Sequence, residues 1–515
     1  MIKLFTLFVC FYFAAVGNIC YAQVAINTTG SQPDASSQLD VSSSNKGILI
    51  PRMTTAGRNT ITSPALGLLV FDTDKGTFMF YDGSKWKALA FSDEDKAAAQ
   101  SRNVDDPAPN AAFGSRVAIS GNYAVIGAPR YATGGLTNAG AAYVFFKGPS
   151  GWKQQAKLQA WDAAASDYFG GAVAISGDYI AVGAAPKSLG GNSAQGKVYL
   201  YKRNGDSWDN DSSVTKAGGA AFEDFGWSVS LSASGSAGPA LLVGVPYSDV
   251  AGTDKGEVQA FTRGASGWAF TQSIVPGDLA ASDYFGAAIS MYGDYAVAGA
   301  TGQDNTTFSY QDAGAVYIFV FGGGVWNLQQ KISGSTAKGQ FGFAISIYDD
   351  KLAVGAPWAT TYNNTSSSVY LYKRTGANWA NTGYLFVYNF EIVPGAGQIN
   401  ANGASTSISI ANLTFGMSVA LDGNTLLVGA SGGIEYPNGG SSYYSDAQGS
   451  VYLYKNFSGD TYTRTQIIKS DYPAIGDLFG MSVGLSDGKY IISNSHAIVN
   501  GNVNAGAVYF GAVTQ

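Results

Sequence analysis

Short stretches of alternating hydrophobic and polar residues follow one another along most of the chain, and a Phe-Gly pair opens seven of them. The clearest begins at Phe169 with FGGAVAISGD, where apolar residues recur at alternate positions, as in a strand with one buried face. Next come the nearly continuous apolar stretch YIAVGAAP, then GKVYLYKR, and then a stretch that begins at Trp208. Each unit therefore predicts four short strands joined by tight turns.

The unit repeats, with spacings of 56, 56, 60, 56, 74 and 64 residues between successive Phe-Gly pairs. Four strands in about 60 residues, repeated seven times, predict an all-β fold, a seven-bladed β-propeller of four-stranded blades. We expect each phenylalanine to fill the wedge between two blades, and the glycines to let neighbouring backbones approach. The seven pairs begin at Phe113, Phe169, Phe225, Phe285, Phe341, Phe415 and Phe479.

Three motifs carried by the units, Phe-Gly, Gly-Ala-Pro and Gly-x-Val-Tyr, resemble the FG-GAP repeat. This repeat builds the propeller at the head of integrin α subunits and of many bacterial surface proteins, and the resemblance covers residues 113–513. Gly-Ala-Pro is complete at residues 127–129 and 355–357, whereas Ser493-Asn494-Ser495 replaces it in the seventh unit. The resemblance implies an integrin-like propeller outside the cell, with its seventh blade furthest from the pattern.

The resemblance also raises the question of calcium, which integrin-type blades often hold in an Asp-x-Asp-x-Asp-Gly loop after their first strand. The corresponding turns here read Ser120-Gly121-Asn122 or Ser176-Gly177-Asp178, and they lack the carboxylates that would enclose a cation. We therefore expect no metal site and no cofactor.

The N-terminus has the features of a secretory signal peptide over residues 1–22. Lys3 precedes an apolar run from Leu4 to Val16, and Ala22 is a small residue at the expected cleavage site. Cleavage there removes both cysteines of the chain, so the mature protein has no thiol. No later run of 18 apolar residues predicts a transmembrane segment. We expect a secreted or cell-surface protein.

Residues 23–91 do not follow the repeat, and they resemble a head module of bacterial secreted and tail-fibre-like proteins. The resemblance rests on the runs LDVSSSNKGILIPRMT and GLLVFDTDKGTFMFYDGSKW. It implies a small β-rich module for display, attachment or oligomerisation. Residues 92–112, rich in Ser, Ala and Asp, are predicted to be a linker to the propeller of residues 113–515.

The seventh blade lacks its outer strand, because the chain ends at Gln515 just after the third. An unpaired sheet edge invites pairing with another segment. Gly83-Ser84-Lys85-Trp86 is similar to the entry of a fourth strand, so we predict that Trp86 to Phe91 pairs with Val508 to Phe510. The alternative is that Trp86 belongs to the end of the head module itself.

The charge of the chain makes nucleic acid an unexpected partner. The chain has 30 Lys and Arg against 36 Asp and Glu, a net charge of −6, and no basic run that could follow a phosphate backbone. Nucleic acid is therefore not an expected partner.

The sequence predicts no catalytic constellation. His496 is the only histidine, and a triad with Ser493 or Ser495 would place all its members in one loop. Acidic residues recur in the connections that enter the blades, and we interpret them as turn caps rather than as metal ligands or an acid/base pair. They are Asp162, Asp167, Glu223, Asp224, Asp278, Asp283, Asp471 and Asp477.

Aromatic residues in long polar loops mark the candidate ligand-binding face, since Tyr and Trp give large contact area at low entropy cost. The alternative is that these rings only cover loop backbone. The predicted function is binding or adhesion to an extracellular protein or glycan, and a carbohydrate-active hydrolase or lyase on the same scaffold is the alternative. The candidate residues are Trp358, Tyr362, Tyr436, Tyr443 and Tyr444.

The acid-poor turns predict that folding does not depend on calcium. We expect the same midpoint of thermal unfolding in EDTA and in millimolar calcium. A ligand that binds only the native state stabilises it by mass action, so a fall of about 10 °C in EDTA would reveal a site that the turns do not show.

Overall fold

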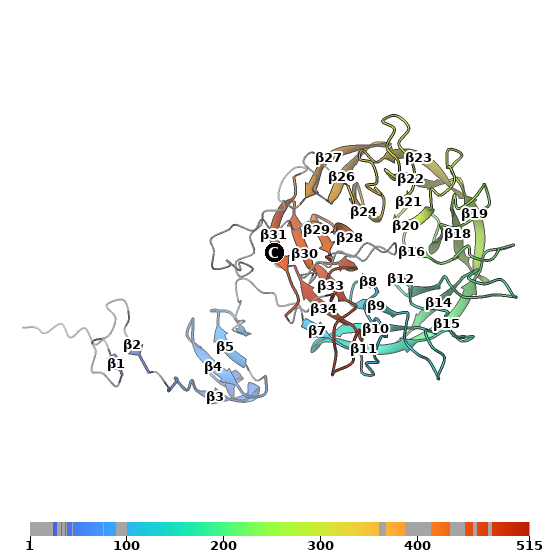
Figure 1. Cartoon of the computed structure of the whole chain (residues 1–515). Helices are drawn as coiled ribbons and strands as arrows, with labels where there is room; N and C mark the ends of the chain where they lie inside the picture. Colours follow the sequence, from blue (N-terminus) through green and yellow to red (C-terminus); the bar gives the residue numbers. More distant parts are fainter. Residues whose placement is uncertain are drawn as a thin grey trace, which may run out of the picture. The chain divides into compact units, whose positions relative to one another are not determined.

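A computed structural model of the chain describes residues 24–27, 32, 37, 39–43, 45–75, 77–88, 100–359, 367–386, 414–432, 449–456, 461–471 and 476–513. The chain divides into two compact units, Met1–Asp95 and Lys96–Gln515 (Figure 1). The all-β prediction is confirmed, since the described residues form strands throughout, apart from one short helix, α2 (Thr55–Asn59).

The N-terminal unit contains two small sheets. In one, β1 (Val24–Ile26) lies parallel to β2 (Leu39–Val41). In the other, the order is β3 (Arg52–Met53), β4 (Leu69–Asp72), β5 (Thr77–Tyr81) and β6 (Trp86–Ala88). Arg58 of α2 pairs with the buried carboxylate of Asp72 at 3.3 Å and so ties the helix to the second sheet.

Seven four-stranded antiparallel sheets follow one another through the described part of the second unit. We number them sheet 1 to sheet 7. Sheet 1 contains β8 (Arg116–Ser120), β9 (Tyr123–Ala128), β10 (Ala141–Gly148) and β11 (Gly151–Leu158); sheet 2 contains β12 (Ala172–Ser176), β13 (Tyr179–Ala184), β14 (Lys197–Asn204) and β15 (Ser207–Val214). Sheet 3 contains β16 (Ser228–Ser232), β17 (Ala240–Val245), β18 (Glu257–Gly264) and β19 (Gly267–Ile274); sheet 4 contains β20 (Phe285–Tyr292), β21 (Tyr295–Ala300), β22 (Ala315–Gly322) and β23 (Val325–Ser333).

The remaining sheets repeat this order, and sheet 7 alone takes its fourth strand from a distant part of the chain. Sheet 5 contains β24 (Ala344–Tyr348), β25 (Lys351–Ala356), β26 (Ser368–Thr375) and β27 (Asn378–Phe386); sheet 6 contains β28 (Phe415–Asp422), β29 (Thr425–Ala430), β30 (Ser450–Lys455) and β31 (Thr463–Ile468). Sheet 7 contains β32 (Val483–Ser486), β33 (Lys489–Asn494), β34 (Ala507–Ala512) and β7 (Gln100–Arg102).

The sheets form a closed ring around a central axis (Figure 1). The first strand of each sheet contacts the first strand of the next, and β32 of sheet 7 contacts β8 of sheet 1. The phenylalanines of the seven Phe-Gly pairs lie between the sheets and are at most 2 % exposed. Their predicted role as wedges is therefore confirmed.

Glycine is required where successive sheets meet. A Cβ atom built on Gly127 of sheet 1 lies 2.0 Å from the carbonyl oxygen of Gly170, which precedes sheet 2. No side chain fits at that distance, so the glycines allow the close backbone approach that the sequence predicts. The same contact, at 2.0 to 2.3 Å, is made by Gly183, Gly244, Gly299, Gly355 and Gly429.

The interface between sheets 7 and 1 is built differently, because Ser493 replaces the glycine of the motif. The Ser493 hydroxyl accepts a hydrogen bond from the Ser482 N–H at 2.8 Å. The Ser482 hydroxyl in turn accepts one from the Val117 N–H at 3.1 Å, and Ser486 accepts one from the Gly121 N–H at 3.0 Å. Side-chain hydrogen bonds thus join the last sheet to the first.

The predicted closure by Trp86 to Phe91 is wrong. Trp86 pairs with Tyr81 in the hairpin of β5 and β6, whose turn is held by the N–H groups of Ser84 and Lys85, which donate to the Asp82 carboxylate at 2.8 and 2.7 Å. The Gly-x-x-Trp pattern therefore marks a local hairpin of the head, as the alternative interpretation held.

The strand that completes sheet 7 is β7, which lies within the predicted linker. It pairs antiparallel with β34, with Arg102 opposite Val508. Arg102 Nε also donates to the carbonyl oxygen of Trp152 at 3.2 Å, and the Trp152 ring stacks on Phe510 at 4.3 Å. The segment before the first repeat thus closes the ring.

Removal of β7 should destabilise the ring. We expect a chain that begins at Lys96 to keep the midpoint of thermal unfolding of the second unit, and one that begins at Val104 to lose about 5 °C or more, because the edge of β34 is then unpaired. Scanning calorimetry of the two chains measures the difference. Equal midpoints would show that β7 does not support the ring.

Candidate functional site

A hollow of about 410 Å³ lies at one end of the ring, where side chains from sheets 1, 2, 3 and 7 meet. Its volume falls within the range of about 300 to 1,000 Å³ that is usual for small-ligand sites. Its lining comprises Ala112, Ser115, Arg116, Pro129, Arg130, Tyr168, Gly171, Ala185, Pro186, Gly226, Trp227, Met481, Ser495 and His496.

The repeat itself positions these side chains. Ser115, Gly171 and Trp227 directly follow a Phe-Gly pair, and Arg130 directly follows Gly-Ala-Pro. The residue before each phenylalanine has a left-handed backbone, with φ of 51° at Tyr168, so each strand is entered through a tight turn. The positions next to the motifs therefore present different side chains on one rigid frame.

Aromatic rings form one wall of the hollow and extend beyond it. Trp227 is 42 % exposed, and its ring meets that of Tyr247 edge-on at 5.6 Å. Tyr247 in turn contacts Tyr284 at 5.6 Å. Burial, together with the nearby Asp224 carboxylate, raises the pKa of the Tyr247 phenol, which stays neutral at physiological pH. The indole of Trp227 is thus braced on one side and open to solvent.

Other lining residues carry positive charge. Arg116 and Arg130 are both exposed, and neither forms an ion pair with any acid in the described part of the chain. Burial and the neighbouring Arg130 charge lower the pKa of His496, so its imidazole is neutral near pH 7. Its Nδ1 lies 3.0 Å from the Ser495 hydroxyl.

One of the five predicted binding residues can be placed. Trp358 is half-buried, and its ring packs edge-on against Phe343 at 4.8 Å. Phe343 follows the Phe-Gly pair of sheet 5, so the two rings lie at the same end of the ring as the hollow. The other four predicted residues, Tyr362, Tyr436, Tyr443 and Tyr444, lie outside the described residues.

Sequence reasoning missed the residues that make the hollow distinctive, Arg116, Arg130 and Trp227. A signal was present, because each of them stands within two positions of a repeat motif.

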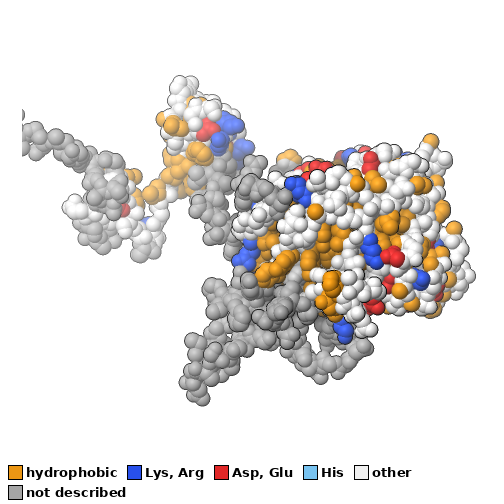
Figure 2. All heavy atoms as spheres, turned by 90° about the horizontal axis from the view of Figure 1, so that it is seen from above, with side chains coloured by type: hydrophobic (Ala, Val, Ile, Leu, Met, Phe, Trp, Pro, Cys, Tyr) orange, Lys and Arg blue, Asp and Glu red, His pale blue; other side chains and the backbone are white. Residues whose placement is uncertain are grey.

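On the face of the second unit shown in Figure 2, hydrophobic side chains gather in patches and charged ones are few.

Asp167, Glu223 and Asp283 cap turns, as the sequence analysis predicted for the recurring acids. Asp167 accepts from the Ala164 N–H at 2.8 Å, and Asp283 accepts from the Ala280 N–H at 2.7 Å. Asp278, the first acid of its pair, instead accepts a hydrogen bond from the Tyr317 hydroxyl at 2.9 Å and pairs with a lysine. These contacts hold the entry connections in place.

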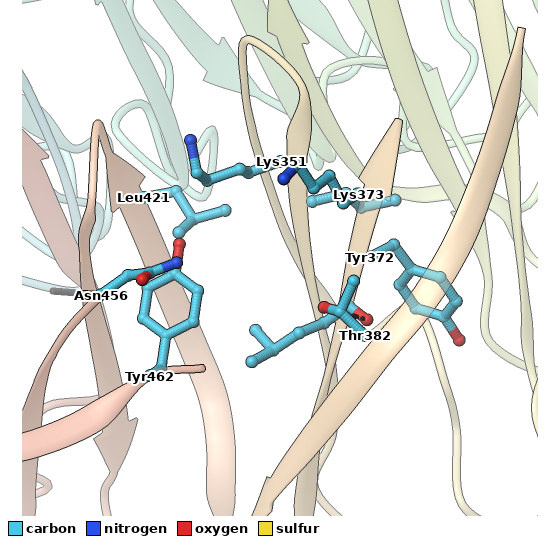
Figure 3. Close-up of a pocket in the computed structure, with 9 residues that line it drawn as sticks. Lys351, Tyr372, Lys373, Thr382, Leu421, Asn456 and Tyr462 are labelled. Carbon is cyan, nitrogen blue, oxygen red and sulfur yellow. Dashed lines mark hydrogen bonds between the residues drawn. The ribbon is translucent and has the colours of Figure 1, made fainter. Parts of the chain in front are cut away.

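A second cavity, between sheets 5 and 6, is too small to hold a ligand (Figure 3). Its volume is about 10 Å³, enough for a single water molecule. Tyr372 and Thr382 line it from sheet 5, and Leu421 lines it from sheet 6. It is a packing gap between neighbouring sheets.

Two further features are absent from the described residues. No three His, Cys, Asp or Glu side chains there are grouped so that they could hold a metal ion. No helix in the same part of the chain is both long and apolar enough to cross a membrane.

The fold and the hollow define a class, an all-β protein with a propeller-like ring of repeated sheets. Comparison with protein families identifies the repeats: residues 104–145, 152–201, 268–319 and 326–372 match the FG-GAP repeat. Residues 25–102 match the phage tail like trimerisation region. The chain thus carries FG-GAP repeats behind a tail-fibre-like head, which confirms the resemblance seen in the sequence. FG-GAP repeats suggest an extracellular protein.

A search of curated proteins found no match. Among solved structures, Sqt1 of Saccharomyces cerevisiae is similar with a TM-score of 0.38 and 10% identity, over 81% of this chain and 98% of that one. A protein from Lactobacillus plantarum is similar with a TM-score of 0.43 and 11% identity, over 73% of this chain and 90% of that one.

Proposed function

We propose that this chain is a secreted or cell-surface binding protein that uses the hollow at the end of its ring to bind an extracellular protein or glycan. The observation that carries the proposal is the hollow itself, whose lining includes the exposed Trp227 and two arginines. Tryptophan, tyrosine and arginine are the residues that contribute most to binding energy at protein surfaces.

The proposal includes a seven-bladed propeller, in which each sheet is one blade. The order of the sheets and the hydrogen bonds between sheets 7 and 1 support this assignment. It also includes a signal peptide cleaved after Ala22, which lies outside the described residues. An extracellular location agrees with the FG-GAP repeats.

A carbohydrate-active hydrolase or lyase is the second candidate, and one observation favours it. Asp224 stands three residues before Trp227, and burial raises the pKa of its carboxyl to about 6. A carboxyl with that pKa can act as a general acid near neutral pH. We favour binding without catalysis, because no acid is among the residues that line the hollow.

The head joins several copies of the chain in this proposal. Large apolar side chains stand exposed in it, with Leu49 at 74 % and Leu66 at 77 %. Exposed apolar residues of this size mark interaction surfaces when they cluster. The match to a trimerisation region makes three copies the expected number. Three linked hollows would bind a repeating ligand more tightly than one, because the later contacts are intramolecular.

Replacement of Trp227 tests the binding site. With a ligand identified on glycan and surface-protein arrays, we expect Trp227→Ala to weaken binding about tenfold or more, because a central aromatic contact is lost. The thermal midpoint should not change, since the indole is exposed. Calorimetric titration measures the affinity.

Trp161→Ala is the matched control, because Trp161 is 45 % exposed and does not line the hollow. Weaker binding by Trp161→Ala alone would place the site elsewhere. Cleavage of a bound polysaccharide that Asp224→Asn abolishes would instead support the enzyme.

The mass of the protein in solution tests the head. We expect the mature chain to have the mass of three copies in size-exclusion chromatography with light scattering, and a chain that begins at Lys96 to have the mass of one. A single-copy mass for the mature chain would contradict trimerisation.

A further inference from the structure

The two arginines of the hollow, unlike Arg203 and Arg263, lack a partner of opposite charge among the described residues. Arg263 pairs with Asp211 at 2.9 Å, and Arg203 pairs with Asp178. Arg116 and Arg130 form no such pair with any described residue, although the whole chain has more acids than bases. Two unpaired guanidinium groups beside one hollow make it locally positive.

Arg116 has free donor groups at the hollow. Its side chain is exposed and lines the hollow. One of its N–H groups donates to the carbonyl oxygen of Ser115 at 2.9 Å. A guanidinium has five donors, so others stay open to a ligand. Arginine binds carboxylate and sulfate-like groups through two parallel hydrogen bonds.

Trp227 offers an apolar surface in the same hollow. The indole of Trp227 is held by Tyr247 and is exposed. Gly171 occupies the equivalent position of its own Phe-Gly pair and has no side chain to fill the hollow. A flat apolar group of a ligand can pack on an indole ring while its polar groups reach the arginines.

We infer that the hollow binds an acidic glycan, a sugar chain that carries carboxylate or sulfate groups. The inference rests on the proposed function, since it names the class of ligand for the same site. A sugar ring has both an apolar face for Trp227 and charged substituents for Arg116 and Arg130.

An acidic peptide that extends a sheet is less well suited to the hollow. Such a peptide binds by adding a strand to free backbone groups. The backbone N–H groups at this end are already used, because Gly114 donates to Gly127 at 2.9 Å and Gly170 donates to Gly183 at 3.0 Å. A glycan needs only the side chains, and displacement by polyglutamate would reveal an acidic peptide that binds the arginine side chains alone.

Matched polymers test the inference on the mature full-length protein. The probes are polygalacturonic acid with its methyl-esterified form, and dextran sulfate with dextran, which separate carboxylate from sulfate recognition. We expect the charged member of one pair to bind at least about tenfold more tightly than its neutral partner, and binding to weaken as salt rises. Arg116→Gln and Arg130→Gln should each reduce affinity about tenfold.

Arg203→Gln is the control, because it removes the same charge from a site that does not line the hollow. Unchanged affinity in Arg203→Gln supports the inference, and an equal loss would reveal a general charge effect and overturn it. Equal binding of charged and neutral polymers that depends on Trp227 overturns the acidic ligand but keeps the proposed function. Displacement of the polymers by polyglutamate at equal concentration points to a peptide and overturns the glycan. Binding that neither Trp227→Ala nor the two arginine variants change overturns both.

Discussion

The close approach of backbones between neighbouring sheets is the constraint on which the rest of this structure depends. Gly127 can lie against Gly170 only because neither has a side chain, and Phe169 then fits into the wedge beside them. The contact recurs at successive sheet boundaries, so the ring is a set of similar interfaces rather than one central core. Each motif of the repeat is therefore explained by an interface, not by a ligand.

The interface between sheets 7 and 1 differs from the others, because it joins segments from the two ends of the repeat region. Val508 pairs with Arg102, 406 positions earlier, so sheet 7 is complete only when nearly the whole chain has folded. Pairings this distant in sequence form slowly. The hydrogen bond from the Gly121 N–H to Ser486 has counterparts between other neighbouring sheets, such as that from the Gly177 N–H to Ser120, so this interface keeps the shared serine contacts although Ser493 prevents the glycine contact.

Sequence patterns predicted the strands well, because alternation, turns and glycine positions are local and recur. The closing strand was missed for a physical reason: Gln100-Ser101-Arg102 is short and polar, and its pairing is decided by the geometry of the completed ring. The sequence analysis also did not predict the hollow, because its residues are distant in sequence. Arg116 and Trp227 are 111 positions apart, and only the curvature of the ring brings their sheets to one site.

The repeat motifs that fix the backbone are made of residues other than the two arginines and Trp227 of the hollow. The hollow can therefore contain arginines without an ion pair. Phenylalanine and glycine of each motif fix the backbone, and the side chain that follows them differs from sheet to sheet, as Ser115, Gly171 and Trp227 show. Trp227 is exposed and Arg116 forms no ion pair in the described structure, and neither is explained by packing. The acidic ligand proposed above would give the two guanidinium groups partners of opposite charge and would cover the exposed indole.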